Sequence, residues 1–283
     1  MYICGIDTSF DDTSISIINN NKIILNKIIT YDFSFYKGVI PNKISNYHKK
    51  NIYNIFINNL KKKKINLFKI DLIAVTYGPG LFNSLLIGIN FSKILSIIIN
   101  KPIYKINHLH AHILSFFIKN SYINKNKIKF PFISLLISGG NTYLSIIYNF
   151  FKIKVYGKTL DNPIGEIYDK IANLLNIKYP GGKKIDKFSK KGKNIFKIKI
   201  PIIKGYNFSF SGIYTFFKKK IFKNKYNIND ICLSFQNIIF KILFNKIYKL
   251  YKKKKINNIS IVGGVSSNKY IINKFIKYSK LYK

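Results

Sequence analysis

The chain has 283 residues, enough for one large domain or two moderate ones with a substantial core. Its formal charge of +39 comes from 49 basic residues, all lysine, against ten acidic ones. This balance is typical of proteins that bind nucleic acid or an anionic surface, although residues with A- and T-rich codons dominate and mutational bias can supply much of the excess. The two cysteines, Cys4 and Cys232, lie far apart and outside any C-x-x-C, so no disulfide framework is implied.

The first hundred residues alternate between strand and helix patterns. We expect strands over residues 2–7, 14–18, 23–29 and 71–76, and helices over residues 46–63 and 81–99. The first strand ends in Asp7, and Asp11 and Asp12 follow in the next loop. Such an end can offer a carboxylate and backbone N–H groups to a phosphate–metal unit, or it can be an ordinary hairpin loop. The turn over residues 78–80, Gly-Pro-Gly, is either an anion site at a helix start or a tight connection.

The sequence predicts neither a membrane span nor a secretion signal. Residues 1–7 lack a basic leader and a small-residue cleavage site, so they do not resemble a signal peptide. The apolar run from Leu85 to Ile99 contains Asn90 and Lys93 and is expected to fall short of a membrane span. We therefore expect a soluble, cytoplasmic protein with no membrane partner.

Three of the four histidines lie within the five residues from His108 to His112. In a helix, His108 and His112 are one turn apart and share a face. Two neutral imidazoles placed in this way can bind one divalent transition metal. His110 would point away from that face and is not counted as a ligand. Polar residues at a helix start explain the pattern without a metal, so both interpretations stay open. Leu109 stands where H-E-x-x-H hydrolases carry a glutamate, so peptidase chemistry is not supported.

The second half of the chain repeats a strand–glycine turn pattern. Buried strands are expected over residues 132–137 and 259–262, followed by the glycine turns at 138–142 and 263–268. The first turn leads into a strand over 143–148, and the second leads into a helix from about residue 269. This repetition favours a duplicated α/β architecture with a ligand cleft between lobes. The chain has no G-x-x-x-x-G-K-[ST], which excludes a P-loop.

Acidic residues and glycines also gather between these two units. The segment 161–170 reads Asp-Asn-Pro-Ile-Gly-Glu-Ile-Tyr-Asp-Lys and leads into a helix expected over residues 171–175. Tyr-Pro-Gly-Gly follows at 179–182, with Asp186 soon after. These carboxylates can accept hydrogen bonds from ribose hydroxyls, or they can cap helices. The turn Phe-Ser-Phe-Ser-Gly at 208–212 has no chemical role that its residues alone would assign.

Taken together, these motifs resemble those of one family, the tRNA threonylcarbamoyladenosine transferases, formerly described as O-sialoglycoprotein endopeptidases. Its members carry G-I-[DE]-T-S-x-D-[DE]-T, matched here by residues 5–13. They also carry G-P-G-L, H-x-x-x-H, S-G-G-[HN]-T, G-E-x-[FY]-D-K, Y-P-G-G, F-S-F-S-G and G-G-V-[SA]-[SA]-N. All eight occur in the family's order between Gly5 and Asn268. Any one of them is weak, but eight in order are specific.

The resemblance implies a duplicated, two-lobed α/β fold of the ribonuclease H-like, actin-like ATPase type, shared with sugar kinases and heat-shock protein 70. Residues 1–107 would form the N-terminal lobe, and residues 108–283 the C-terminal lobe with the metal site and the nucleotide loops. The family transfers the threonylcarbamoyl group of threonylcarbamoyl-AMP to N6 of the adenosine next to the anticodon, in tRNAs that read ANN codons. Partners implied by the resemblance are tRNA, a paralogous protein of the same complex and an accessory ATPase.

The family's site residues carry over to this chain by position. His108 and His112 would bind one Fe²⁺ or Zn²⁺ ion, which would coordinate the threonylcarbamoyl group. Asp12 and, after it, Asp11 are the catalytic candidates, as proton acceptor or water-holding groups near the reacting centre. The residues implied in substrate or nucleotide binding are Leu136, Ile137, Ser138, Gly139, Gly140, Asp169, Gly182, Asp186 and Asn268.

One departure from the family lies at the end of the chain. Family members normally continue into a further strand and a D-N-G-A motif whose aspartate is a third metal ligand, whereas this chain stops at Lys283. We therefore expect a C-terminally truncated version of the fold, in which water, substrate or another carboxylate completes the metal's coordination.

Two alternative functions stay open beside the transferase. The first is a catalytically weak subunit that binds nucleotide and tRNA within the same complex. The second is a small-molecule kinase of the same fold, although the histidine pair argues against it, because such phosphoryl transfer normally uses carboxylates and Mg²⁺.

Overall fold

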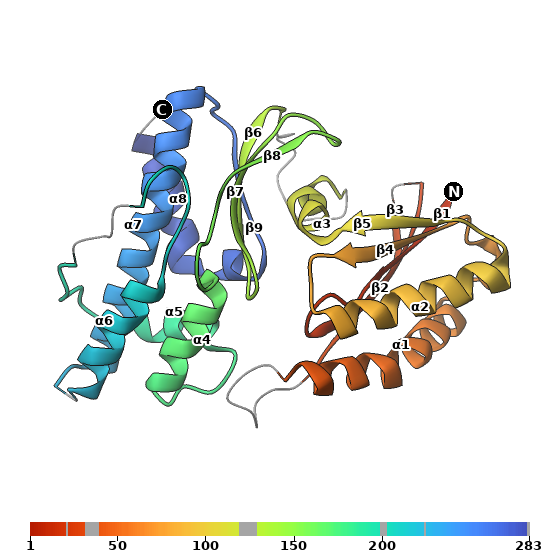
Figure 1. The fold of residues 1–283 in the computed structure, drawn as a ribbon, viewed down its shortest axis with the longest axis horizontal. Coiled ribbons are helices and arrows are strands. Elements are labelled where there is room, and N and C mark those ends of the chain that lie inside the picture. Colours follow the sequence, from red (N-terminus) through yellow and green to blue (C-terminus); the bar gives the residue numbers. More distant parts are fainter. Residues whose placement is uncertain (21, 32–39, 119–128, 199–202, 224, 282–283) are drawn as a thin grey trace. The chain divides into compact units, whose positions relative to one another are not determined.

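The chain forms two compact units, Met1–Asn124 and Lys125–Lys283 (Figure 1). The computed structural model describes residues 1–20, 22–31, 40–118, 129–198, 203–223 and 225–281. The division falls after the histidine segment, whereas the sequence analysis placed it at residue 107. The physical reason is that the His108 ring bonds to Asp7 and Ser9, at the end of the first strand. The histidine segment therefore belongs to the first unit.

The first unit is built on a five-stranded sheet in the order β3-β2-β1-β4-β5. Its strands are β1 (Tyr2–Asp7), β2 (Asp12–Asn19), β3 (Lys22–Thr30), β4 (Leu72–Gly78) and β5 (Ile103–Asn107). The first three run antiparallel, while β4 and β5 run parallel to β1. The four strands expected from the apolar pattern are confirmed, each to within two residues; β5 was not predicted.

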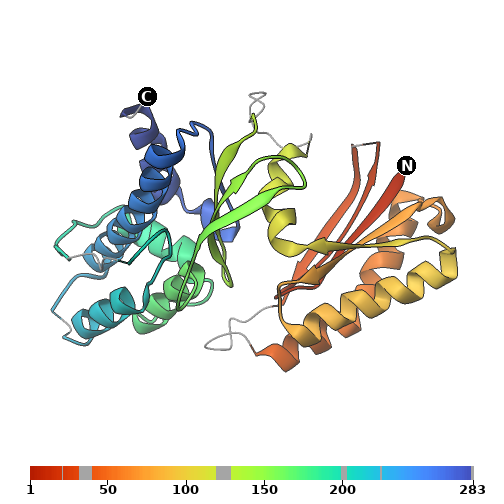
Figure 2. The ribbon, with the colours of Figure 1, turned by 45° about the horizontal axis from the view of Figure 1, so that its top comes forward.

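Two long helices, α1 (Pro41–Lys63) and α2 (Phe82–Ile99), lie along one face of this sheet (Figure 2). Ile52, Phe56 and Leu60 are spaced one turn apart on α1 and are buried in the core against the strands. The helix α1 begins five residues before the expected start because Pro41 occupies its first turn, where a missing N–H costs nothing. Short 3-10 turns at η1 (Leu67–Lys69) and η2 (Ser115–Phe117) complete the unit with α3 (His108–Leu114).

The helix α2 is long and apolar enough to cross a membrane by length and composition, contrary to the sequence expectation. Its 18-residue window has a mean hydropathy of 1.7, so Asn90 and Lys93 do not offset its isoleucines. A single helix of this kind is weak evidence, because helices that cover a sheet in globular proteins pass the same test. Here α2 packs against α1 and β4.

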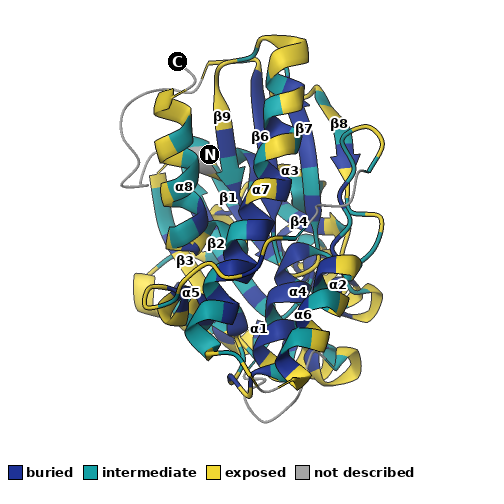
Figure 3. Ribbon diagram, turned by 90° about the vertical axis from the view of Figure 1, so that its left-hand side faces the viewer, coloured by how far each residue is buried: buried dark blue, intermediate teal, exposed yellow. Residues whose placement is uncertain are grey.

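The second unit repeats the strand order of the first, with a sheet ordered β8-β7-β6-β9. Its strands are β6 (Phe132–Ile137), β7 (Thr142–Ile147), β8 (Ile153–Lys158) and β9 (Ile259–Val262). Again three strands run antiparallel and the fourth runs parallel to the first. Every residue of β6 is buried, which explains its continuous apolar sequence, and β6 and β7 are dark blue in Figure 3. The expected duplication is therefore present in the topology.

Five helices cover this sheet and surround the core of the second unit. They are α4 (Ile164–Leu174), α5 (Gly181–Ser189), α6 (Ser211–Phe222), α7 (Ile228–Lys254) and α8 (Lys269–Leu281), with a 3-10 turn η3 (Gly264–Ser267). The helix α4 begins seven residues earlier than expected, directly after Pro163, which caps it in an extended conformation. The Gly-Glu-Ile-Tyr-Asp motif therefore lies on a helix and not in a turn.

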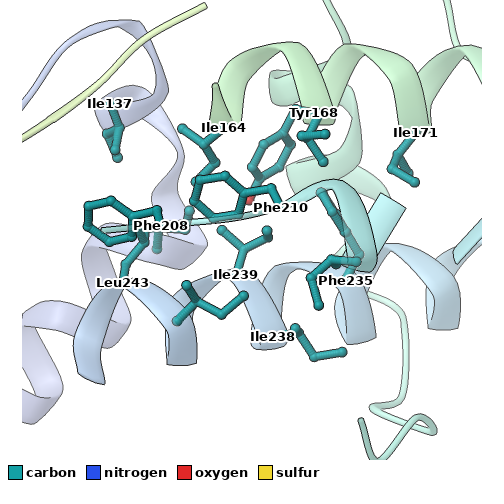
Figure 4. Packing of buried hydrophobic residues seen from close by; sticks show 14 of the residues in the cluster. Ile137, Ile164, Tyr168, Ile171, Phe208, Phe210, Phe235, Ile238, Ile239 and Leu243 are labelled. Atoms are coloured by element: carbon teal, nitrogen blue, oxygen red, sulfur yellow. The ribbon is translucent and has the colours of Figure 1, made fainter. Parts of the chain in front are cut away.

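The Phe-Ser-Phe-Ser-Gly segment has a structural role that its sequence did not reveal. Phe208 and Phe210 are fully buried and stack with ring centroids 6.0 Å apart, in the core between α4 and α7 (Figure 4). Asp161 holds the segment in place, because its carboxylate accepts the backbone N–H groups of Phe210 (3.0 Å) and Ser211 (3.1 Å) at the start of α6. Burial alone would raise the pKa of Asp161, but hydrogen bonds from the Ser209 hydroxyl and from these two N–H groups lower it.

Gln236 of α7 is the centre of a buried polar network that ties together the helices of the second unit. Its amide nitrogen donates to Ser189 Oγ (2.6 Å), and its carbonyl oxygen accepts from Asn268 Nδ2 and from the Tyr168 hydroxyl. Those partners lie on α5, before α8 and on α4, and Gln236 is 0% exposed. Because buried amide groups are costly without partners, the network fixes these elements against α7.

Replacing Gln236 with leucine is expected to lower the free energy of unfolding by about 2–4 kcal/mol, because Asn268 Nδ2 and Ser189 lose buried partners. Urea unfolding followed by circular dichroism measures the change. Asn245→Leu, at an exposed position of the same helix, is the control and should stay within about 0.5 kcal/mol of wild type. Equal, small changes in both variants would show that the network carries no stability.

His48 of α1 is also fully buried, and its hydrogen bonds fit the neutral ring. Nε2 donates to the Phe10 carbonyl (2.8 Å), and Nδ1 accepts the Thr13 hydroxyl (2.7 Å). Burial lowers the pKa of His48, against the opposing effects of the Phe10 carbonyl and the charges of Asp7 and Asp12. The unfolded chain therefore binds a proton at His48 at a higher pH than the folded chain does.

This difference predicts a stability that is complete above about pH 6.5, the pKa of an unfolded histidine, and that falls as the pH drops below it. His48→Gln should remove its share, since glutamine can donate to Phe10 and accept from Thr13 without titrating. Between pH 7.5 and 5.5 the wild type should lose more unfolding free energy than the variant, by up to about 1.4 kcal/mol per pH unit. The other histidines are common to both proteins, so identical pH dependences would refute the assignment.

Candidate functional site

The loops that follow the parallel strands carry most of the residues that the sequence singled out. In the first unit these loops follow β1, β4 and β5. In the second unit they follow β6 and β9. Loops at the carboxyl ends of parallel strands are where ligands bind in α/β sheets.

The first unit brings the two predicted metal ligands together. Asn107 caps α3, its side-chain oxygen accepting the N–H groups of Leu109 (2.9 Å) and His110 (3.2 Å), and so starts the helix at His108. The Nε2 atoms of His108 and His112 lie 3.1 Å apart, and the two rings meet edge to face with centroids 4.4 Å apart. His110 is exposed and forms no part of this pair.

The spacing of these two nitrogens fits a shared metal ion. Two nitrogens bound to one ion at about 2.1 Å and at octahedral or tetrahedral angles stand roughly 3.0–3.4 Å apart. His108 Nδ1 lies 3.0 Å from the Asp7 carboxylate, an arrangement that favours the neutral tautomer with its hydrogen on Nδ1 and its lone pair on Nε2. A carboxylate behind a ligating histidine is a common arrangement in metal sites. Within the described ranges, no group of three or more His, Cys, Asp or Glu side chains that could hold a metal ion is present.

Two side chains at this pair have shifted pKa values. Burial alone would raise the pKa of Asp7, but the hydrogen bond and charge of His108, with hydrogen bonds from Ser9, lower it to about 2. Burial, and then the neighbouring His108, lower the pKa of His112. Near neutral pH the site therefore holds an ionised carboxylate and a neutral imidazole at His112 that can donate its lone pair.

The sequence offered the strand end at Asp7 as a possible carboxylate for a phosphate–metal unit, but it did not connect Asp7 or Ser9 with the histidine pair. Ser9 Oγ lies 3.1 Å from His108 Nδ1, and its backbone N–H donates to Asp7 (2.7 Å). The available signal was position, because Asp7 ends the strand whose carboxyl edge is shared with β4 and β5. The partner of Asp7 lies 101 residues away in the chain, which no local spacing could indicate.

The Gly-Pro-Gly turn at the end of β4 packs against the loop that contains Ser9. A side chain at Gly80 would place its Cβ 2.5 Å from the Ser9 carbonyl oxygen, and that oxygen accepts the Leu81 N–H (2.8 Å). Glycine is thus needed for the close approach of the two loops. Of the two interpretations of this turn, the contacts account for the tight connection.

The two catalytic candidates, Asp11 and Asp12, lie at the start of β2, beside the end of β3. The Asp12 carboxylate accepts the Thr30 hydroxyl (2.5 Å), and the Asp11 carbonyl accepts the Tyr31 N–H (3.3 Å). The carboxylate that bonds to the histidine pair is that of Asp7. The proposed proton-transfer roles of Asp11 and Asp12 stay predictions.

In the second unit, three glycine-containing loops meet at the ends of β6 and β9. The Ser138 N–H donates to the Asn141 carbonyl (2.8 Å) and so closes the turn after β6. A Cβ at Gly165 would lie 2.5 Å from the Ser138 oxygen, so the start of α4 touches this turn. Gly263 has a φ of +94°, and a Cβ there would lie 2.4 Å from the Ile137 oxygen. Gly139 and Gly140 are exposed at this junction, where a phosphate can approach the backbone.

Two of the residues predicted to line the substrate site have buried side chains. Leu136 and Ile137 are both 0% exposed and belong to the strand β6. Neither residue exposes surface to a ligand in this structure. Their role in the site, like that of Ser138 and the two glycines that follow it, stays a prediction.

The carboxylates and the asparagine predicted to hold ribose, base or phosphate act as helix caps in this structure. Asp169 accepts the Gly181 N–H (2.8 Å) at the start of α5, and burial raises its pKa. Asp186 accepts the N–H groups of Tyr270 (3.1 Å) and, at 3.3 Å, Lys269. The Asn268 side chain accepts the N–H at residue 271 (3.0 Å). A Cβ added at Gly182 would meet no atom within 4 Å. The capping interpretation left open by the sequence is thus realised, and it shapes the loops on which the nucleotide site would depend.

Comparison with known proteins places the chain in a family. The sequence profile of tRNA N6-adenosine threonylcarbamoyltransferase matches residues 22–281. The chain is 41% identical to a relative of that name from Thermosipho melanesiensis, across 99% of this chain and 86% of the relative. It is 40% identical to one from Riemerella anatipestifer, across 94% of this chain and 80% of the relative.

Solved structures with the same architecture have dissimilar sequences. Full-length HypF, crystallised with phosphate and nucleotide, matches with a TM-score of 0.65 and 13% identity, over 99% of this chain and 51% of that one. Component A of the Acidaminococcus fermentans (R)-2-hydroxyglutaryl-CoA dehydratase matches with a TM-score of 0.52 and 15% identity, over 97% of this chain and 86% of that one. The fold is therefore the expected duplicated, ribonuclease H-like fold of the actin-like ATPases. By the extent and identity of the sequence matches, the chain belongs to the tRNA N6-adenosine threonylcarbamoyltransferase family, acyltransferases that form threonylcarbamoyladenosine on tRNA.

Proposed function

We propose that this chain transfers the threonylcarbamoyl group of threonylcarbamoyl-AMP to N6 of the adenosine next to the anticodon, in tRNAs that read ANN codons. The observation that carries the proposal is the histidine pair, with its Nε2 atoms 3.1 Å apart and its orientation fixed by Asp7. We assign one Fe²⁺ or Zn²⁺ ion to this pair. When bound, the ion supplies Lewis acidity toward the carbamoyl carbonyl.

The residues of the chain would then have distinct tasks in acyl transfer to a weakly nucleophilic amine. Asp7 holds the tautomer of His108 so that Nε2 faces His112. The exposed backbone of Gly139 and Gly140 is suited to hold the phosphate of the AMP leaving group. Asp12 is proposed as the proton acceptor, because a carboxylate with one oxygen on Thr30 keeps a second oxygen to accept a proton.

Partners and location follow from the same proposal. The family name implies a tRNA substrate. We further propose a paralogous protein partner and an accessory ATPase, and we place the protein in the cytoplasm, where tRNA is modified. The exposed isoleucines of α2, Ile94, Ile97 and Ile98, support a protein partner, because exposed apolar patches on helices commonly mark interaction sites.

Replacing His112 with alanine is expected to abolish both metal binding and transfer, since one imidazole cannot hold the ion alone. Bound iron is measured by mass spectrometry of metal-reconstituted protein, and transfer by chromatography of nucleosides from a tRNA transcript. His110→Ala, an exposed position two residues away on the same helix, is the matched control. Wild-type metal content in the His112 variant would contradict the site. A wild type that binds metal and tRNA but makes no modified base would favour the catalytically weak subunit.

Replacing Asp7 with asparagine is expected to weaken metal binding about 10–100-fold, because the amide no longer fixes His108 with a charged acceptor. Asp12→Asn should leave metal affinity unchanged and slow single-turnover transfer, which separates the two carboxylates. Isothermal titration gives the affinity, and rapid quench gives the rate. Unchanged transfer in Asp12→Asn would remove that residue from the chemistry.

A further inference from the structure

Three tyrosines from separate segments of the second unit meet beside the strand β8. Tyr148 follows β7, Tyr156 lies on β8 and Tyr206 lies before the segment that enters the core. The hydroxyl groups of Tyr148 and Tyr156 are 3.4 Å apart, and the rings of Tyr156 and Tyr206 meet edge to face with centroids 5.8 Å apart. All three rings are half-buried and pack against the core of the unit.

Four exposed lysines lie over these rings. Lys152 Nζ is 5.7 Å from the Tyr148 ring centroid, and Lys249 Nζ is 5.7 Å from that of Tyr206. Two ammonium groups lie over the Tyr156 ring: Lys154 Nζ is 5.5 Å and Lys254 Nζ is 5.6 Å from its centroid. We call these four lysines and three tyrosines the lysine–tyrosine surface. Its charges come from β8, the turn before it and the end of α7, and the rings restrict where each flexible lysine can go.

Nothing described in the chain neutralises these four charges. None of the four lysines has a salt-bridge partner within the described ranges. The acidic residues of the second unit lie at 161–186 and at Asp230, in the first turn of α7, whereas Lys254 ends that helix. A helix C-terminus accounts for a lysine such as Lys254. It does not account for the lysines on β8 and in the turn before β8, although one of them, Lys154, lies over the same tyrosine ring as Lys254.

We propose that the lysine–tyrosine surface is a docking site for the sugar–phosphate backbone of the tRNA substrate. Ordered ammonium groups without acidic partners match a row of phosphates, and neighbouring tyrosines are suited to contact sugars and exposed bases. The inference rests on the proposed function for the identity of the RNA.

The test compares two sets of four neutralised lysines. One variant carries Lys152→Gln, Lys154→Gln, Lys249→Gln and Lys254→Gln. The control neutralises residues 61–64, four exposed lysines at the end of α1 that lie over no ring of the described chain. Both lose four charges from a chain of +39, so a difference between them reflects position and not net charge.

Binding of an unmodified tRNA transcript is measured by fluorescence anisotropy across a salt series. The surface variant should bind at least ~10-fold more weakly near 0.1 M salt, and its log–log salt slope should fall by about 3, close to one per lost phosphate contact. The control should change less than ~2-fold. Equal losses in both variants, or no loss in the surface variant, would overturn the proposal.

A second variant tests the rings while keeping every charge. Tyr156→Leu should weaken tRNA binding several-fold, because two lysines lose their ring, whereas Tyr156→Phe should bind as wild type. Thermal unfolding of both variants checks that the fold is intact. Binding that survives in a folded Tyr156→Leu protein would overturn the role given to the ring.

Vesicles of phosphatidylserine and phosphatidylcholine provide the competing class of partner. If the four substitutions abolish vesicle binding but leave tRNA binding intact, the surface faces a membrane and the proposal is wrong. The binding assay needs neither donor nor metal. A wild type that binds tRNA through this surface but transfers nothing would therefore end the proposed function and leave this inference standing.

Discussion

The hydrogen bond between His108 Nδ1 and the Asp7 carboxylate, 3.0 Å long, is the interaction on which the candidate site depends. It joins the last residue of β1 to the first residue of α3. Both residues lie at the edge of the sheet where the parallel strands β1, β4 and β5 end. Because it fixes the tautomer of His108, it leaves Nε2 free and turned toward His112. The same bond keeps Asp7 ionised, with a pKa of about 2. A metal site with two protein ligands needs such orientation, since few other contacts define the position of the ion.

The second unit has the same topology, but different residues lie in the loops that follow its parallel strands. Its parallel strands β6 and β9 also end in loops, but close glycine contacts, not histidines, determine how these loops meet. The carboxylates of Asp169 and Asp186 accept N–H groups at the helix starts behind the loops. Gln236 ties those helices together through its own hydrogen bonds. The duplication thus yields one unit that presents a histidine pair and another that presents exposed backbone. We propose that these two kinds of group serve a metal-assisted transfer from an adenylate.

Sequence patterns predicted the elements whose apolar residues alternate or recur each turn, such as β1, β6 and α2. They placed the starts of α1 and α4 too late, because a proline at or before a helix start interrupts the apolar pattern without ending the helix. The histidine pair was predictable because both residues lie on one helix. The Asp7 contact was not, since only the fold brings residues 101 positions apart together. Carboxylates in glycine-rich segments were ambiguous because capping and ligand binding favour the same residues.

The most direct test of the central claim is X-ray absorption on the iron-reconstituted protein. The structure predicts scattering from two imidazole rings with nitrogens at about 2.1 Å, and oxygen ligands in the remaining positions. Sulfur ligation is not expected, because Cys4 and Cys232 are buried and burial raises the pKa of each thiol to about 12. A spectrum with one imidazole, or with none, would contradict the account of this site.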